Sequence, residues 1–399
     1  MRTFCLCLAA ATLAGMVSGG AELKFDPAAL TPDIPSRDYP RLALLNDRTL
    51  IMADMGRVFF STNQASSWSN GLLINGGCAN TQRLPSGAVH KLTRTNWQPF
   101  VLPDGSVLLA YRSHSNRKPA KPGDEFYSSI RVMNGDAGAK NFTNELVLVE
   151  TVVDTFRGFW EPFMVQLNSD TVALYYSDDH ISNSYQTINY FLYSVKDRRW
   201  DPTLRIAVDG KPRRSRDGMP SVVRLKDGSW AMVIETFDYN RVNSGHNSVF
   251  VVGLTRSKDG KVWTPPVVVA APHNLDSGKR CSAPFIAALP DGRVAVTYMT
   301  DEYYRGDIMA EREGTRVFAM VVSDRPLLYD TRLENSSGGP APGFAEIKNV
   351  FPPVDNSFQI WNTAFCADGM LYVAGHFGVN ADTVRSVGHK IRLRRAPVK

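Results

Sequence analysis

The stretch Gly158-Phe-Trp-Glu-Pro-Phe-Met-Val-Gln-Leu-Asn-Ser-Asp170 decides the fold that the sequence predicts. It places Glu161 directly before a proline at the start of an apolar run, and this run ends in an Asn-Ser-Asp turn. A second apolar run, from Thr171 to Tyr176, follows at once. Two such runs joined by a short polar turn are typical of a β-hairpin. The hairpin decides the fold because the chain repeats it.

The repeat consists of a proline or its substitute, a short apolar run and a turn that usually contains Asp-Gly. Its six copies are residues 39–47, 98–105, 161–170, 219–228, 283–292 and 362–369, the last with Thr363 in the place of the proline. A proline is tolerated at the first residue of a strand, and Asp-Gly favours a hairpin turn. The period of roughly 55 to 80 residues leaves room for further strands in every copy. The sequence therefore predicts an all-β fold, a six-bladed β-propeller of four-stranded antiparallel blades.

Two further segments support the propeller. Residues 61–68 have the spacing of the Asp-box turn, Ser-x-Asp-x-Gly-x-Thr-Trp, with Asn63 and Ala65 substituted, and residues 257–263 form a copy that is one residue short. Such boxes join the third and fourth strands of sialidase-type blades, and we expect both segments to do so here.

The N-terminal residues 1–21 have the pattern of a secretory signal peptide, with Arg2 before an apolar core and small residues at its end. This predicts a secreted, extracellular protein in which residues 22–399 form a single catalytic propeller domain. The apolar core is short for a membrane span, and no later stretch is long and apolar enough to be one. Asn141 and Asn335 begin glycosylation sequons, which also occur by chance.

Three cysteines, Cys78, Cys281 and Cys366, remain after the signal peptide, so one disulfide with a free thiol and no disulfide at all are both open. No Cys-x-x-Cys or His-x-x-x-His pair predicts a metal site, and we expect no cofactor. The formal charge of +6 could draw a secreted protein to an acidic surface such as a pectic wall, but solubility explains it equally well. Nothing in the sequence indicates nucleic-acid or membrane partners, and we expect a monomer.

The repeat also predicts which residues share one face of the propeller. The first strand of each blade starts at the proline and the second runs back, so strand-one starts and strand-two ends meet at one face. Seven positions after the turn, the second strand ends at Arg112, Ser177, Glu235, Met299 or His376 in blades two to six, and at Met55, beside Asp54, in blade one.

Two acidic residues, Glu161 and Glu235, are brought to this face by neighbouring blades. Glycoside hydrolysis needs such a carboxyl pair, because one group protonates the leaving oxygen and the other attacks or activates water. A single glutamate at a strand end is more often a solvated rim residue. Two of them near the axis favour catalysis.

Further residues are predicted by the same alignment to bind substrate. The candidates are Asp38, Trp97, Gln98, Arg112, Trp160, Asp178, Asn362 and His376. Arg112 could equally pair with a carboxylate for structural reasons, and His376 could be an internally bonded residue. The tryptophans Trp97, Trp160 and Trp361 could be packing wedges or platforms on which a sugar stacks.

Together, Trp160-Glu-Pro-Phe163, Ile234-Glu-Thr236, Tyr39-Pro-Arg41 and the substituted Asp boxes resemble glycoside hydrolase family 93 over essentially the whole mature chain. That family comprises secreted six-bladed exo-α-1,5-L-arabinanases of the sialidase-like superfamily. The resemblance implies a retaining enzyme that releases arabinobiose from the ends of arabinan chains, with Glu161 and Glu235 as the catalytic pair. We expect Glu161 to be the acid/base and Glu235 the nucleophile, held ionised by Arg112, with the reverse assignment open.

Two alternatives are a sialidase and a sugar-binding propeller without catalysis. A sialidase needs an arginine triad, which only Arg37, Arg112 and Arg280 could supply, and its arginine before the first proline is replaced by Asp38. A lectin propeller would repeat its binding residues in every blade, whereas the rim residues here differ from blade to blade. A last expectation concerns ring closure: residues 21–25 should pair beside the C-terminal strand at residues 390–395.

Overall fold

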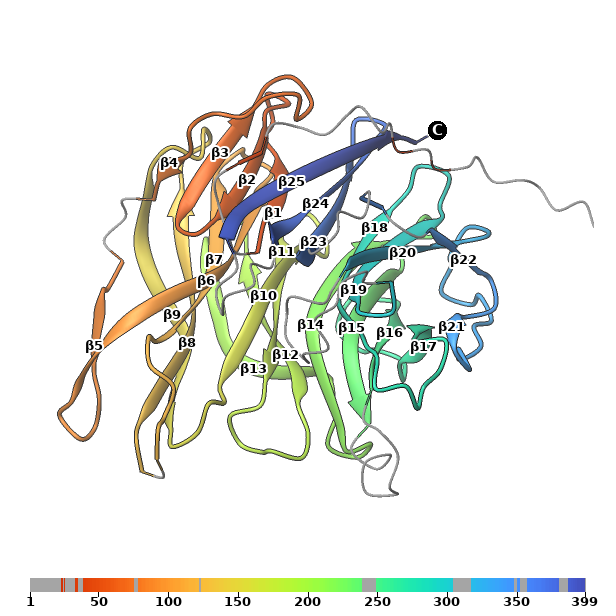
Figure 1. Ribbon diagram of the computed structural model, residues 1–399. Coiled ribbons are helices and arrows are strands. Elements are labelled where there is room, and N and C mark those ends of the chain that lie inside the picture. The colour runs from red at the N-terminus through yellow and green to blue at the C-terminus, as the bar shows by residue number, and fades with distance from the viewer. Residues whose placement is uncertain are drawn as a thin grey trace, which may run out of the picture.

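The computed structural model describes residues 23, 25, 33–34, 39–74, 78–121, 123–238, 249–303, 317–347, 350–351, 357–379 and 387–398. The described chain consists of β-strands joined by turns and loops (Figure 1). None of these residues forms a helix of the length and apolar character that a membrane span requires. The strands form six antiparallel sheets, the blades of a propeller.

The strands follow the blades in chain order. Blade one contains β1 (Arg41–Leu44), β2 (Leu50–Asp54), β3 (Arg57–Ser61) and β4 (Leu72–Leu73). Blade two contains β5 (Thr81–Arg83), β6 (Val89–Val101), β7 (Val107–Ser115), β8 (Phe126–Gly135) and β9 (Phe142–Val153). Blade three contains β10 (Phe159–Gln166), β11 (Thr171–Asp178), β12 (Thr187–Ser194) and β13 (Arg199–Val208).

The second half of the chain is organised in the same way. Blade four contains β14 (Ser215–Arg224), β15 (Trp230–Asp238), β16 (Phe250–Ser257), β17 (Val267–Ala271) and β21 (Gly339–Pro340). Blade five contains β18 (Cys281–Ala288), β19 (Val294–Thr300), β20 (Val317–Ser323) and β22 (Phe344–Ile347), and blade six β23 (Ser357–Ala367), β24 (Met370–Val379) and β25 (Val387–Pro397). The predicted six-bladed all-β fold is confirmed, although the described blades have three to five strands rather than a uniform four.

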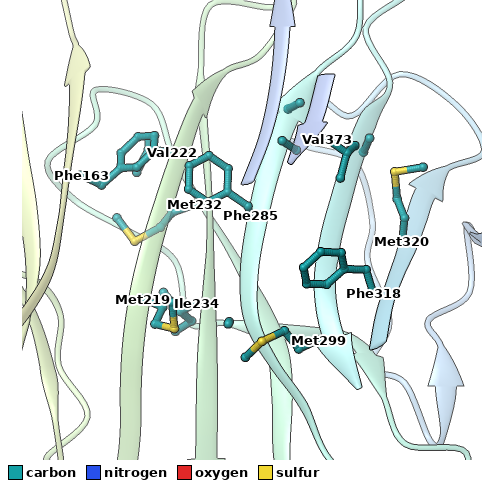
Figure 2. Packing of buried hydrophobic residues seen from close by; sticks show 14 of the residues in the cluster. Phe163, Met219, Val222, Met232, Ile234, Phe285, Met299, Phe318, Met320 and Val373 are labelled. Carbon is teal, nitrogen blue, oxygen red and sulfur yellow. The ribbon is translucent and has the colours of Figure 1, made fainter. Parts of the chain in front are cut away.

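The core lies between blades, because each inner sheet face packs against the next blade. Strands such as β11 and β19 are therefore buried along nearly their whole length and read as continuous apolar runs. On the axis, the rings of Phe163 and Phe285 from blades three and five meet edge to face at 5.5 Å (Figure 2). Beyond them, residues of all six inner strands line a cavity of about 400 Å³.

Each inner strand from blade two to blade six carries a β-bulge at the same place. In blade three, Trp160 pairs with Ser177 and Phe163 with Tyr175, so Glu161 and Pro162 together oppose a single residue. The first bulged residue of every blade has a left-handed backbone. These are Asn96 (φ 57°), Glu161 (φ 41°), Met219 (φ 53°), Ala283 (φ 48°) and Trp361 (φ 57°). We call the end of the propeller at which these five residues lie the bulge face.

The pairing register confirms that the residues predicted as strand-two ends occupy equivalent positions, but the prediction that the strands end there is wrong, because each strand continues one to three residues further. Each predicted strand-two end lies opposite the residue directly before the bulge. The pairs are Thr95 with Arg112, Trp160 with Ser177, Gly218 with Glu235, Ser282 with Met299 and Ile360 with His376. The carboxylates of blades three and four are thus presented at the bulge face, as expected.

The inner-strand alignment is right in blades three, four and five and wrong in blades two and six. In blade two the bulge falls on Asn96-Trp97, two residues before the Gln98-Pro99 that the repeat suggested. In blade six it falls on Trp361-Asn362 rather than Asn362-Thr363. The bulge position is therefore set by strand pairing and side-chain packing, not by the proline itself.

The ring closure that the structure describes lies at Ile34, and residues 21, 22 and 24 of the segment expected to close it lie outside the described residues. Ile34 forms an antiparallel bridge with Ile391 of β25, with backbone hydrogen bonds in both directions. Of residues 21–25 the structure describes Leu23 and Phe25, and neither pairs with a strand. Leu23 is buried in the core instead, and the Phe25 carbonyl accepts a hydrogen bond from Arg394. Figure 1 shows β25 beside the strands of blade one.

Both substituted Asp boxes form the predicted turns, between β3 and β4 and between β16 and β17. In the second, Asp259 Oδ1 accepts hydrogen bonds from the backbone N–H groups of Lys261 and Val262 at 2.8 and 3.0 Å. In the first, Asn63 Oδ1 accepts from the N–H of Ser67 at 3.0 Å, so the amide replaces the usual carboxylate. Cys78, Cys281 and Cys366 are free thiols.

Candidate functional site

The two candidate catalytic carboxyls lie at the bulge face on neighbouring blades. Glu161 is the bulged residue of blade three and is partly buried. Glu235 lies in β15 of blade four, three residues before the strand ends at Asp238, and is 8% exposed. The negative charge of Glu235 is one of the causes that raise the pKa of Glu161.

Glu235 is held by one ion pair and one backbone hydrogen bond. Arg216 Nη1 donates to Glu235 Oε1 at 2.7 Å, and the backbone N–H of Ala283 in blade five donates to Oε2 at 3.0 Å. Both oxygens thus have protein partners that fix the orientation of the carboxylate. The arginine that faces Glu235 is therefore Arg216 and not, as expected, Arg112.

The bond from Ala283 belongs to a pattern that joins successive blades. The strand-two end of one blade accepts a hydrogen bond from the backbone N–H of the bulged residue of the next. Met219 N donates to Ser177 Oγ at 2.9 Å, Ala283 N to Glu235 Oε2 at 3.0 Å, and Trp361 N to Met299 Sδ at 3.1 Å. In blade two this position is occupied by Arg112, whose guanidinium has no acceptor atom. In blades three to five this position accepts a hydrogen bond from the next blade. In blade two it supplies a positive charge instead, which opposes the rise in the pKa of Glu161.

Trp160 and Arg112 stack on each other beside Glu161. The guanidinium carbon of Arg112 lies 3.4 Å from the centre of the Trp160 ring system, a cation–π contact. Trp160 is fixed in turn by Asp179, whose Oδ1 accepts hydrogen bonds from the indole Nε1 at 2.9 Å and from Gly158 N at 2.7 Å. Trp160 thus holds the guanidinium of Arg112 in place by stacking.

The other two tryptophans differ in exposure. Trp97 is buried and stacks on Tyr111 of its own blade, with ring centroids 4.3 Å apart, so it packs the interior of blade two. Trp361 is partly exposed and stacks on Tyr39 of blade one at 4.2 Å.

Burial raises the pKa of Glu161 to about 7, and the negative charge of Glu235 adds to the rise, while Arg216 and Arg112 oppose it. Burial also raises the pKa of Asp179 against the hydrogen bonds from Trp160 and Gly158. Although burial works against the charge of Arg216, its pKa is raised because Glu235, Glu161 and Asp179 surround it. Arg216 is thus the central cation among three carboxyl groups.

The remaining predicted binding residues are placed less uniformly. Asp178 is turned into blade three, where its Oδ1 and Oδ2 accept hydrogen bonds from His180 at 2.5 Å and from Asn189 at 2.7 Å. Asn362 connects blades, since its Nδ2 donates to the Ala283 carbonyl at 2.8 Å and its Oδ1 accepts from Thr297 at 2.5 Å. The side chains of Asp178 and Asn362 are thus occupied by protein partners.

Gln98, His376 and Asp38 complete the set. Gln98 follows the blade-two bulge, donates to the Pro99 carbonyl at 3.1 Å and lines the axial cavity. His376 is buried at the bulge face, with its ring edge-on to Phe358 at 5.6 Å. Asp38 lies outside the described residues.

Arg216 and Asp179 were missed by the sequence analysis. Arg216 is one of three arginines in the segment 213–216, and nothing in their order tells which one reaches the site. Asp179 directly follows β11, which ends at Asp178, so the alternation of side chains along the strand did not place it.

Two of the three arginines considered for a sialidase triad are described by the structure. Arg280 Nε lies 3.6 Å from Asp301 Oδ2, and Arg112 is stacked on Trp160. Arg37 lies outside the described residues. Within the described chain, no group of three or more His, Cys, Asp and Glu side chains is arranged to hold a metal ion.

No family model matches this chain, and no curated protein matches it in sequence. Solved structures share its fold. The family 93 α-L-arabinofuranosidase of Fusarium graminearum, in complex with arabinobiose, is 14% identical and superposes with a TM-score of 0.58 over 92% of this chain and 95% of its own. The α-L-arabinanase of Penicillium chrysogenum, also with arabinobiose, is 15% identical, with a TM-score of 0.57 over 93% and 98%. A protein of unknown function from Dyadobacter fermentans is 12% identical, with a TM-score of 0.57 over 92% and 96%.

These likenesses concern the fold. The chain has the six-bladed propeller of the family 93 enzymes, so the family resemblance drawn from its motifs is confirmed at the level of architecture.

Proposed function

We propose that this protein is a secreted, retaining glycoside hydrolase that acts on α-1,5-linked arabinan from the chain end and releases arabinobiose. The observation that carries the proposal is the carboxyl pair at the bulge face. The pKa of Glu161 is raised to about 7, and the carboxylate of Glu235 is bonded to Arg216. Two proteins of the same fold are an arabinofuranosidase and an arabinanase, both with arabinobiose bound.

In the proposed mechanism the two glutamates have different tasks. Glu161 is protonated near neutral pH and gives its proton to the glycosidic oxygen as the bond to the leaving sugar breaks. Glu235 attacks the anomeric carbon and forms a covalent glycosyl-enzyme. Glu161 then removes a proton from the water that hydrolyses this intermediate. Retention requires carboxyl groups about 5 to 5.5 Å apart.

The surroundings of each glutamate support this assignment. Glu235 is oriented by Arg216 and by a backbone N–H, as a nucleophile that must point at one carbon should be. Glu161 lacks a direct ion pair among the described residues, and burial keeps its proton available near pH 7. The connections at residues 116–125 and 179–186 are long and polar, and we infer that they close one end of the cleft and impose attack from the chain end.

The test uses Glu161→Ala and Glu235→Ala with linear arabinan and an aryl arabinoside. Both variants should fold normally by circular dichroism and lose turnover by on the order of 10³-fold or more. Azide should rescue Glu235→Ala with an inverted glycosyl azide and Glu161→Ala with a retained one. Near-normal activity in either variant would refute the carboxyl pair, and an early ladder of long products would refute attack from the chain end.

Assays of the wild-type protein distinguish the proposed function from the two alternatives. Turnover of a sialoside but not of arabinan would favour the sialidase alternative. Binding of arabinan without any hydrolysis would favour a sugar-binding propeller.

A further inference from the structure

Asn96 occupies in blade two the place that Glu161 occupies in blade three. Both are the first residue of the bulge, both have a left-handed backbone, and both directly follow the residue opposite the strand-two end. Their Cα–Cβ bonds therefore have equivalent directions relative to their own blades. Sequence reasoning missed Asn96 because the proline of the blade-two repeat suggested Gln98 instead.

The amide of Asn96 is only partly used by the protein. Asn96 is 3% exposed, and its Oδ1 accepts a hydrogen bond from Thr95 Oγ1 at 3.0 Å. Its Nδ2 finds no hydrogen-bond partner within the part of the chain that the structure describes. A buried donor without an acceptor lowers stability, so such a group is retained where something else supplies the acceptor.

The surroundings of Asn96 belong to the candidate site. The preceding residue, Thr95, pairs with Arg112, and Arg112 stacks on Trp160 and acts on the charge of Glu161. Blade two is also the direct neighbour of blade three around the ring. The unpartnered N–H groups thus lie on the blade next to the proposed acid, on the side away from Glu235.

We propose that Asn96 is a further substrate-binding residue, whose Nδ2 donates a hydrogen bond to an oxygen of the sugar held against Glu161. The inference rests on the proposed function, because it takes the substrate to be an arabino-oligosaccharide. A sugar hydroxyl or ring oxygen is the acceptor that the amide lacks. The bond would position the sugar whose glycosidic oxygen Glu161 protonates.

A competing explanation is that asparagine is present only because it tolerates a left-handed backbone better than most residues. Glycine separates the two explanations, since it adopts this backbone without strain but has no amide. Asn96→Gly should therefore be as stable as the wild type, or more so, and lower kcat/KM for linear arabinotriose by about 10- to 100-fold. Asn96→Asp, which keeps the shape but loses both donors, should also lower kcat/KM.

The chain offers a matched control in Asn144, another left-handed asparagine (φ 55°), exposed on the outer strand β9. Asn144→Gly should leave kcat/KM unchanged. Binding of arabinotriose to Glu235→Gln, with and without Asn96→Gly, gives a second measurement that is independent of turnover.

The outcomes separate the two proposals. If the wild type hydrolyses arabinotriose and Asn96→Gly binds and hydrolyses it equally well, the role of Asn96 is refuted while the proposed function stands. If the wild type neither hydrolyses nor binds arabinotriose, the proposed function is wrong and the role of Asn96 fails with it.

Discussion

Glu161 has the same backbone geometry as four other residues but a different chemistry. Met219, Ala283 and Trp361 occupy the corresponding place in later blades and are apolar. The same backbone geometry thus occurs at five positions, and the side chain determines the chemistry of each. Of these five residues only Glu161 of blade three is acidic, and there the preceding blade contributes Arg112 in place of a hydrogen-bond acceptor.

The raised pKa of Glu161 predicts a pH-dependent loss of stability. The pKa of Glu161 is about 7 in the folded protein, above the ordinary value of 4.5, so the folded state binds this proton more tightly than the unfolded state. The resulting contribution to stability is complete below pH 4.5 and is lost as the pH rises to 7. Glu161→Gln cannot ionise. Its free energy of unfolding should match the wild type at pH 4 and exceed it by roughly 3 kcal/mol at pH 8.

Denaturant unfolding at the two pH values measures this difference. The exposed Glu334→Gln is the control and should show no such pH-dependent gain, since its side chain is 59% exposed. An equal effect of Glu161→Gln at both pH values would show that Glu161 does not titrate in this range in the folded protein.

At the scale of elements, the repeated β-bulge explains both the success and the failure of the sequence analysis. The second strands could be aligned because their apolar runs follow Asp-Gly turns of fixed geometry, and this placed Arg112 and Glu235 correctly. The inner strands could be aligned only where a proline marks the bulge. The bulge at Asn96-Trp97 contains no proline, so its position in blade two was predicted wrongly.

The arginine partner of Glu235 could not be predicted from the repeat either. The ion pair of Arg216 with Glu235 joins β14 and β15 within blade four, and Arg213 and Arg214 lie directly before β14. Which arginine reaches the site depends on how β14 enters its sheet. The path of β14 depends on packing against blade three, and a repeat within single blades carries no information on packing between blades.

The Asp-box turns allow an element-scale prediction. Asp259 accepts hydrogen bonds from two backbone N–H groups and one from Ser257, and these bonds outweigh burial and lower its pKa. Asp259→Ala leaves those donors without their acceptor and should lower the free energy of unfolding by about 1–3 kcal/mol. Lys261→Ala in the same turn keeps the backbone N–H and removes only an exposed charge near Asp259, so it should have almost no effect. Equal effects of the two substitutions would mean that the turn is not held by the Asp259 carboxylate.

At the scale of the whole molecule, stability depends on how the ring is closed. Ile34 is 4% exposed and bonded through its backbone to Ile391, whereas Asp33 pairs with Lys390 and Arg392 at a more exposed position. Ile34→Ala should therefore cost about 2–4 kcal/mol, because it leaves a cavity at the closure. Asp33→Ala should cost less than about 1 kcal/mol, because its ion pairs are partly solvated.

Thermal and denaturant unfolding of the two variants tests the closure. If Ile34→Ala were no more destabilising than Asp33→Ala, the apolar bridge would not be the closing contact. Ile34→Ala should destabilise the whole protein, which should still unfold in a single transition, because the substitution weakens the contact between blades one and six.

The bridge between Ile34 and Ile391 also sets an order of events during synthesis on the ribosome. Ile34 emerges early and has to wait for its partner, while blades two to five are made and can pack on one another in sequence. Until residue 391 is available, the growing arc keeps an unpaired edge at which a second nascent chain could add a strand. The time that the ribosome takes to deliver the last blade is therefore the period in which this protein is most exposed to misassembly.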